Sequence, residues 1–184
     1  MAALSIITPC SRPQNLSRIW PTLPPGCQWL IILDRTDSSE VPEALKSAPG
    51  VEIQCLKGGG SWGNPQRNRG LSLAKRDYVY FLDDDNIVHP KLMPLLAEHA
   101  PSQQIIVVNQ HLADGTLRLK AAPPVEVTRI DTAQVLIPRK YATEFRWKRT
   151  VAVADGLYFA ALYAKFQDRF LFLDVDAAYY NYLR

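Results

Sequence analysis

Short apolar runs alternate with segments of helical periodicity along the first 110 residues of the chain. The apolar runs are rich in β-branched and aromatic residues, as is typical of strands buried in a sheet, and they cover residues 4–8, 29–33, 51–56, 78–82 and 105–109. Each expected helical segment begins at a proline, a residue favoured in the first helical turn; these segments are residues 13–20, 42–46, 65–75 and 90–99. This alternation predicts an α/β fold with a mostly parallel sheet.

The last third of the chain has a less regular pattern. A hairpin is expected around Asp114-Gly115, a dipeptide typical of tight turns, and a turn followed by a strand is expected within residues 128–137. A helix with one apolar side is predicted over residues 157–166, and residues 171–173 form a late apolar segment. The closing tyrosines are expected to serve packing or an interface; they are Tyr179, Tyr180 and Tyr182.

Composition and charge set broad limits on the class of protein. The 184 residues are enough for one domain with a sizeable core, and 47% hydrophobic with 21% charged residues is ordinary for a globular protein. A net charge of +3 does not by itself call for a nucleic-acid partner. Three cysteines without disulfide or CxxC spacing indicate a reducing compartment. The sequence shows no signal-peptide pattern and no run long enough to cross a membrane, so a cytoplasmic protein is expected.

Three consecutive carboxylates, Asp83-Asp84-Asp85, directly follow the apolar run 78–82. Adjacent anions at a strand end repel one another, and a bound divalent cation would offset that repulsion. The alternative is a solvated acidic turn. The buried strand before the triplet and Pro90 after it place the carboxylates at the carboxyl end of a strand, where open α/β sheets bind their ligands. The context therefore favours a metal or nucleotide site.

A glycine-rich loop, residues 57–63, precedes the third long helical segment. It lacks the GK[ST] of a P-loop and the spacing of a dinucleotide fingerprint, so a loop beside a ligand and a plain connection fit it equally well. Asn64 is expected to cap the helix that Pro65 opens. Arg67 and Arg69 are either solvated surface charges or phosphate ligands at a helix N-terminus, and the residues alone do not decide between these alternatives.

Taken together, these features resemble the nucleotide-sugar glycosyltransferases of the GT-A fold over about residues 4–165. The strongest match pairs residues 64–70, Asn-Pro-Gln-Arg-Asn-Arg-Gly, with residues 79–86, Val-Tyr-Phe-Leu-Asp-Asp-Asp-Asn. The pair is similar to the QRN helix and DDDN strand of the inverting glucuronosyltransferases that build proteoglycan linkers, and bacterial family-2-like inverting transferases share the same DXD arrangement. Further matches are Ile6-Ile7-Thr8-Pro9 with Arg12-Pro13, Asp34 after the second strand, and Ala154-Asp155 at a helix start.

The resemblance implies one GT-A α/β/α domain over residues 1–184, with residues 1–110 binding the nucleotide and residues 111–184 facing the acceptor. It implies transfer of a sugar from a nucleoside-diphosphate sugar, a UDP-sugar above all, to an acceptor hydroxyl with inversion. Asp85 and Asp83 would hold Mn²⁺ or Mg²⁺, and Asp155 would act as general base. Donor binding would fall to Thr8, Pro9, Arg12, Asp34, Asn64, Arg67, Asp83 and Asp84. Asp155 departs from the glucuronosyltransferases, which carry glutamate there.

The sequence alone leaves several alternatives to this assignment open. Asp155 could be an ordinary helix N-cap. A nucleotidyltransferase would use the same architecture, although its basic glycine-rich loop after the first strand is replaced here by residues 9–12, Pro-Cys-Ser-Arg. A non-catalytic nucleotide or nucleic-acid module would use the arginines near residue 67 and bind without a metal, but the acidic triplet argues against it. The acceptor is expected to be a saccharide or a lipid-linked saccharide rather than nucleic acid, and peripheral membrane attachment and a homodimer are compatible with the sequence.

Overall fold

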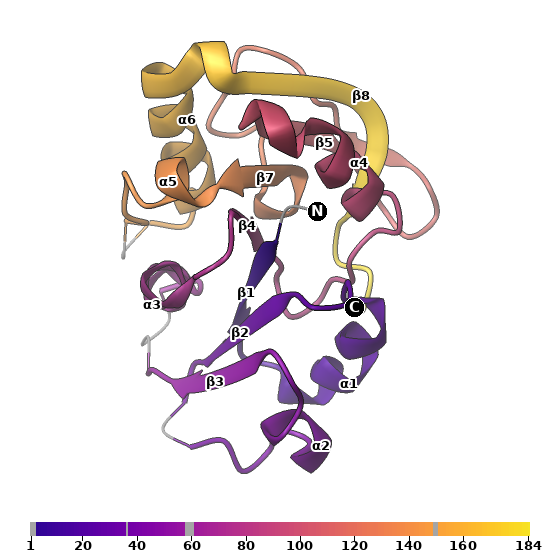
Figure 1. The fold of residues 1–184 in the computed structure, drawn as a ribbon, viewed down its shortest axis with the longest axis vertical. Helices are drawn as coiled ribbons and strands as arrows, with labels where there is room; N and C mark the ends of the chain where they lie inside the picture. Colours follow the sequence, from indigo (N-terminus) through magenta and orange to yellow (C-terminus); the bar gives the residue numbers. More distant parts are fainter. Residues whose placement is uncertain (1–2, 36, 58–60, 149–150) are drawn as a thin grey trace.

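The computed structural model describes residues 3–35, 37–57, 61–148 and 151–184 (Figure 1). Within this part of the chain the strands form a single eight-stranded sheet in the order β3-β2-β1-β4-β7-β5-β6, and β8 also pairs with β5. The strands are β1 (Leu4–Cys10), β2 (Gln28–Leu33), β3 (Val51–Cys55), β4 (Tyr78–Phe81), β5 (Ile105–His111), β6 (Leu117–Leu119), β7 (Val135–Pro138) and β8 (Phe170–Tyr179). The predicted α/β fold is thereby confirmed.

The first four strands form a parallel unit with β1 at its centre. β1 pairs in parallel with β2 on one side and with β4 on the other, and β3 continues the sheet beyond β2. The chain therefore runs outward from β1 to β3 and then returns through α3 (Asn64–Leu73) to the opposite side of β1. A reversal of this kind opens a crevice between the carboxyl ends of the two strands, here β1 and β4.

Helices cover both faces of the sheet, as Figure 1 shows. One core layer joins the sheet to α1 (Leu16–Ile19), α2 (Glu43–Lys46) and α4 (Leu92–His99). The other layer joins it to α3, α5 (Arg139–Ala142) and α6 (Ala154–Phe166). Along β4, Tyr78 and Tyr80 belong to the first layer, whereas Val79 and Phe81 belong to the second. The apolar run before the acidic triplet is thus buried on both faces, as predicted.

Several elements differ from the sequence-based expectation. The expected helix at residues 13–20 consists of a single α-helical turn between two 3-10 turns, and Trp20 at its end is 41% exposed. The short apolar segment at 171–173 is the start of the ten-residue strand β8, which runs parallel to β5. Apolar length alone underestimated β8 because its second half alternates with Asp174 and Asp176.

The hairpin predicted around Asp114-Gly115 is confirmed. β5 and β6 are antiparallel, and the turn between them is closed by a bond from the Leu112 amide to the Thr116 carbonyl at 2.9 Å. Gly115 supplies a φ of 85°, which a residue with a side chain rarely adopts. The predicted glycine-rich loop lies partly outside the described residues, since residues 58–60 are not among them. None of the helices in the described part of the chain has the length and apolar character needed to cross a membrane.

Candidate active site

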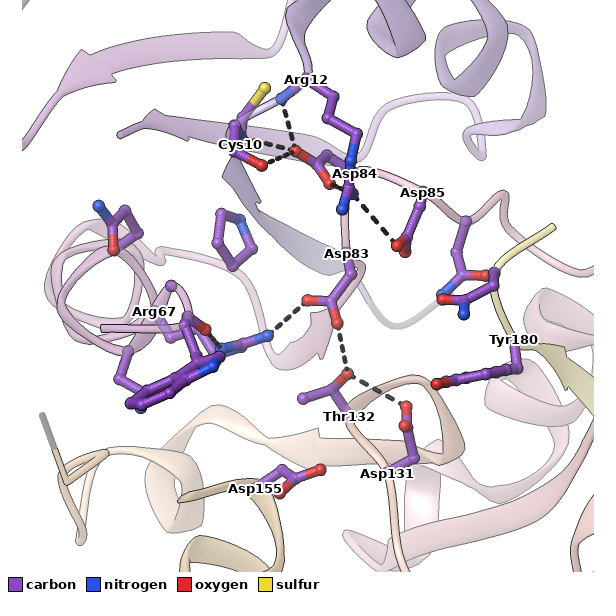
Figure 2. A pocket seen from close by; sticks show the side chains of 18 of the residues that line it. Cys10, Arg12, Arg67, Asp83, Asp84, Asp85, Asp131, Thr132, Asp155 and Tyr180 are labelled. Carbon is purple, nitrogen blue, oxygen red and sulfur yellow. Dashed lines mark hydrogen bonds and ion pairs between the residues drawn. The ribbon is translucent and has the colours of Figure 1, made fainter. Parts of the chain in front are cut away.

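A cavity of about 620 Å³ lies at the carboxyl ends of β1, β2 and β4 (Figure 2). Its walls come from both parts of the chain: the loop after β1, the acidic triplet after β4, the N-terminal turns of α3 and α6, and the end of β8. Nine of the ten residues predicted for the site line it. They are Pro9, Arg12, Asp34, Asn64, Arg67, Asp83, Asp84, Asp85 and Asp155.

Thr8 is the exception. Its side chain is fully buried, and its hydroxyl accepts a hydrogen bond of 2.9 Å from the indole nitrogen of Trp29 on β2. The expectation of donor contact came from the resemblance of residues 6–9 to the first strand and nucleotide loop of the GT-A transferases. Because Thr8 is held between two strands inside the sheet, it supports the site from behind rather than lining it.

The middle residue of the triplet, Asp84, holds the loop that follows β1. Its carboxylate accepts from the backbone amides of Ser11 at 2.6 Å and Arg12 at 2.7 Å, and from the Ser11 hydroxyl at 3.0 Å. The Arg12 guanidinium adds an ion pair at 2.5 Å. Three of these four donors contact Oδ2, and the Arg12 guanidinium contacts Oδ1. Asp84 therefore fixes the loop that runs from Pro9 to Arg12.

Asp85 faces the cavity between two arginines. Its side chain, only 5% exposed, pairs with Arg12 at 3.1 Å and with Arg184 at 2.6 Å. Burial, followed by the negative charge of Asp83, raises the pKa of Asp85, and the two arginines oppose that shift. Asp83 and Asp85 are thus two mutually repelling carboxylates in one cavity, which is a setting that added positive charge would relieve.

The residues present fit a cation that arrives with a substrate better than a cage made of protein alone. Within the described part of the chain no three His, Cys, Asp or Glu side chains converge on one point. Mg²⁺ at nucleotide sites is commonly held by one or two carboxylates, with phosphate oxygens and water completing its coordination. Asp83 and Asp85 can supply that smaller set.

Arg67 is a buried charge, so the solvated-surface alternative is wrong for it. One guanidinium nitrogen pairs with Asp83 at 2.5 Å, and the other donates to the Trp62 carbonyl at 2.7 Å and to Asn64 at 3.2 Å. The guanidinium also lies over the ring of Trp147, 4.9 Å from its centre. Arg67 is therefore committed to protein partners. Arg69, by contrast, is exposed and donates to Gln54.

The predicted capping role of Asn64 is wrong, because Asn64 is already the first residue of α3. The N-cap is Gly63, whose φ is 76°, and a Cβ there would come within 2.7 Å of the Pro9 side chain. The Asn64 amide instead donates to the carbonyls of Lys148 at 3.0 Å and Val151 at 3.3 Å. Asn64 therefore ties the start of α3 to the segment that leads into α6.

Asp155 lies in the first turn of α6, but it is not the N-cap, which is Val153. Its carboxylate accepts from the Gly156 amide at 2.8 Å and makes no ion pair with any residue in the described ranges. Burial raises the pKa of Asp155 to about 6, with the nearby charge of Asp131 adding to the effect. The simple capping interpretation is therefore wrong, and Asp155 is a partly buried carboxylate that lines the cavity.

Glycine at position 156 sets where this carboxylate lies. A Cβ at Gly156 would come within 1.8 Å of the Val127 carbonyl oxygen, far closer than any real contact. The first turn of α6 therefore packs directly against the backbone of the segment before β7. That contact fixes the direction in which Asp155 leaves the helix.

Sequence reasoning missed the wall that faces Asp83, formed by Arg118, Asp131, Thr132 and Tyr180. Figure 2 shows the hydrogen bonds that run from Asp83 through Thr132 to Asp131. Asp131 caps a 3-10 turn in a capping box with Gln134. The spacing Asp-x-x-Gln was a signal that could have marked this turn, whereas no pattern in the sequence pointed to Arg118 or Tyr180.

The strand order, the reversal at β1 and the cavity at that point match the α/β architecture of the GT-A fold, with a ligand site where the strand order reverses. The model of the family described as glycosyl transferase family 2 matches residues 30–170. The chain belongs to this family. That membership favours a transferase over the nucleotidyltransferase and the non-catalytic module considered above.

Solved structures of Staphylococcus aureus TarS share the fold. The structure of TarS residues 1–349 with UDP superposes with a TM-score of 0.76 at 16% identity, covering 97% of this chain and 60% of that one. The corresponding complex with UDP-GlcNAc gives a TM-score of 0.74 at 12% identity, covering 98% and 58%. Longer TarS gives 0.73 at 15% identity, covering 97% and 36%. The chain thus spans about a third to three fifths of these proteins. No curated protein matches it.

Proposed function

We propose that the chain transfers a sugar from a nucleoside-diphosphate sugar to an acceptor hydroxyl with inversion at the anomeric carbon. Membership of glycosyl transferase family 2 supports the transfer reaction. UDP-sugar is the proposed donor because TarS, which has the same fold, has been solved with UDP and with UDP-GlcNAc. The observation that carries the proposal is Asp155, a partly buried carboxylate that lines the cavity and makes no ion pair with any described residue.

The donor would occupy the part of the cavity formed by residues 1–110. Pro9 and Arg12 belong to the loop that Asp84 holds, so this surface is already shaped before a ligand arrives. Asp34 lies just beyond β2 in the same cavity and would accept from an N–H of the base. Arg12 has a side chain 37% exposed and would exchange part of its contact with Asp85 for diphosphate oxygens.

Mn²⁺ or Mg²⁺ is the proposed cofactor, held by Asp85 with help from Asp83 and by the diphosphate. When bound it stabilises the charge that develops on the departing nucleoside diphosphate. The protein's own contribution on this side is to keep Asp83 in place through Arg67 and Thr132.

Asp155 is the proposed general base. A carboxylate with a pKa of about 6 is largely ionised at pH 7, yet it takes a proton more readily than an ordinary aspartate. The absence of an ion-pair partner among the described residues leaves an oxygen of Asp155 available to an acceptor hydroxyl. Removal of that proton as the hydroxyl attacks the anomeric carbon from the face opposite the leaving group would give inversion.

The test begins with binding and continues with turnover. Calorimetry with UDP, GDP and ADP, each with and without Mn²⁺, is expected to show binding of one nucleoside diphosphate that strengthens with the metal. Nucleotide release from the matching nucleotide sugar is then measured with a panel of saccharide acceptors, and the anomeric configuration of the product is read by NMR. Absence of nucleotide binding, or a product with retained configuration, would contradict the proposal.

A further inference from the structure

Tyr180 lies just beyond the end of β8 and forms part of the cavity wall. Its backbone amide donates to the His111 carbonyl on β5 at 3.0 Å, which extends the pairing of the two strands. Asn181 follows with a φ of 51° and turns the chain away, a conformation that asparagine tolerates better than most residues. The backbone therefore fixes where the Tyr180 side chain enters the cavity.

The Tyr180 ring is held from one side by Arg118. The guanidinium carbon lies 3.6 Å from the ring centre, a close cation–π contact. Arg118 itself is bound to Gln110 and, at 3.2 Å, to Asp131. Asp131 is further fixed by the Gln110 amide at 3.0 Å. The ring thus rests on a guanidinium that cannot move without breaking an ion pair.

The Tyr180 hydroxyl, in contrast, makes no hydrogen bond with any residue in the described ranges. Figure 2 shows it directed into the cavity on the side of Asp131 and Thr132. The neighbouring tyrosines behave differently, since Tyr179 packs against His89 and against Tyr182 with ring centres 4.7 and 4.5 Å away. Of these three closing tyrosines, Tyr180 is the one whose side chain faces the cavity, so the expectation of packing or an interface is wrong for it.

We propose that the Tyr180 hydroxyl binds a hydroxyl group of the acceptor, next to the one that Asp155 deprotonates, and that Arg118 positions its ring. The inference rests on the proposed glycosyl transfer. Tyr180, Asp131 and Asp155 all come from residues 111–184, whereas the loop proposed to hold the donor comes from residues 9–12. A fixed O–H that can both donate and accept suits the hydroxyl groups of a sugar.

The charges on this wall further define the class of acceptor. Arg118, whose guanidinium lies against the Tyr180 ring, is neutralised by Asp131. An acceptor phosphate or carboxylate beside the Tyr180 hydroxyl would therefore meet a guanidinium that is already paired. We infer that the sugar unit bound at Tyr180 is uncharged.

The experiment compares wild type with Tyr180→Phe, which keeps the ring and its contact with Arg118 but removes the hydroxyl. Nucleotide release from a UDP-sugar is measured with uncharged p-nitrophenyl glycosides and with a p-nitrophenyl glucuronide as acceptors. Loss of one hydrogen bond is expected to raise the KM for an uncharged glycoside about three- to tenfold. The KM for the donor is expected to change by less than about twofold. Tyr182→Phe removes a hydroxyl outside the cavity and serves as the matched control.

Arg118→Gln tests the positioning role. It is expected to raise the acceptor KM at least as much as Tyr180→Phe does, while Arg118→Lys, which keeps a cation near the ring, restores part of the loss. A purely structural role would instead lower the thermal midpoint and affect donor and acceptor KM alike.

Several results would overturn the inference without touching the proposed function. These are an unchanged acceptor KM in Tyr180→Phe, a change confined to the donor KM, stimulation by the glucuronide but by no uncharged glycoside, or donor hydrolysis that no glycoside stimulates. If wild type neither binds a nucleoside diphosphate nor cleaves a nucleotide sugar, the proposed function fails first, and this inference fails with it.

Discussion

The two sides of the cavity treat their carboxylates in opposite ways. On the side of β4, each aspartate of the triplet has an arginine partner: Arg67 for Asp83, Arg12 for Asp84, and Arg12 with Arg184 for Asp85. On the side of α6, Asp155 accepts one backbone hydrogen bond and has no cation partner in the described chain. The aspartates after β4 are therefore held by arginines. The Asp155 carboxylate has no such partner and is open to an incoming ligand.

This contrast separates binding from proton transfer. At Asp85 two arginines oppose the rise in pKa that burial and the charge of Asp83 cause. Asp155 has no ion-pair partner in the described chain, and its partial burial raises its pKa to about 6, so it takes a proton more readily. The position of each aspartate in the fold, rather than its residue type, therefore decides which role it can fill. Three variants and one pH series test this contrast between the β4 side and the α6 side.

Asp155→Asn is expected to have the largest effect. Asparagine matches the size of the side chain but cannot accept the acceptor proton, so turnover should fall by about 10²–10⁴ while nucleotide affinity stays near wild type. Because the folded-state pKa of Asp155 is raised to about 6, its ionised form disfavours folding above that pH. The thermal midpoint of the variant at pH 7 should equal or exceed that of wild type. Near-normal turnover with saturating donor and acceptor would remove Asp155 from the mechanism.

Asp84→Ala is expected to have the next largest effect, which is mainly a loss of thermal stability. Removing this carboxylate leaves two backbone amides and a guanidinium without their acceptor. Leaving two backbone amides without their acceptor costs about 1–3 kcal/mol each, and a total of about 3 kcal/mol corresponds to a fall of roughly 6–12 °C in the midpoint for a chain of this size. Calorimetric unfolding checks this. A midpoint equal to wild type would show that the loop after β1 does not depend on Asp84.

The pH dependence of turnover should report Asp155 directly. With a pKa of about 6, the fraction ionised falls about tenfold per pH unit well below 6, so kcat measured from pH 8 to pH 5 should bend near 6. The stability linked to this group has the opposite trend: it is fully present below the unfolded pKa near 4 and is lost as pH rises through about 6. In Asp155→Asn both trends should disappear. A wild-type profile that is flat down to pH 5 would contradict the assignment.

Asp85→Asn should have the smallest effect on stability, in contrast to its neighbour Asp84. The pKa of Asp85 is raised, so its charge does not favour the folded state, and both of its arginine partners have side chains more than a third exposed. The midpoint is expected to stay within about 2 °C of wild type, while Mn²⁺ no longer strengthens nucleotide binding. If calorimetry still shows that Mn²⁺ strengthens nucleotide binding by this variant, a residue other than Asp85 holds the cation.

Most of the fold could be predicted from the regular alternation of apolar runs and helical segments in the first 110 residues. The apolar run before the triplet could be interpreted as a doubly buried strand because Tyr78 to Phe81 contain no polar side chain in either phase. The late strand β8 was underestimated, since Asp174 and Asp176 lie on its exposed positions and break the apolar run. Its parallel pairing with β5 depends on contacts that local sequence does not encode.

The candidate site likewise has a part that could be predicted from the sequence and a part that could not. Nine of the residues predicted for the site line the cavity, because strand ends and helix starts can be located from the sequence. The division of labour within the triplet could not be predicted, since it depends on which way each carboxylate points once the loop after β1 has folded against it. Tyr180 was missed for a related reason, because three tyrosines in a short stretch look alike until the sheet orients one of them inward.

Gly156 carries a consequence beyond the placement of the helix. It takes no part in the proposed chemistry, yet the Val127 carbonyl occupies the space that any other side chain needs. Even alanine would push α6 outward and carry Asp155 away from the cavity centre with it. If position 156 is randomised and the library is selected for transfer activity, only glycine should be recovered. Position 156 would then tolerate substitution as poorly as Asp155, although Gly156 itself takes no part in the chemistry.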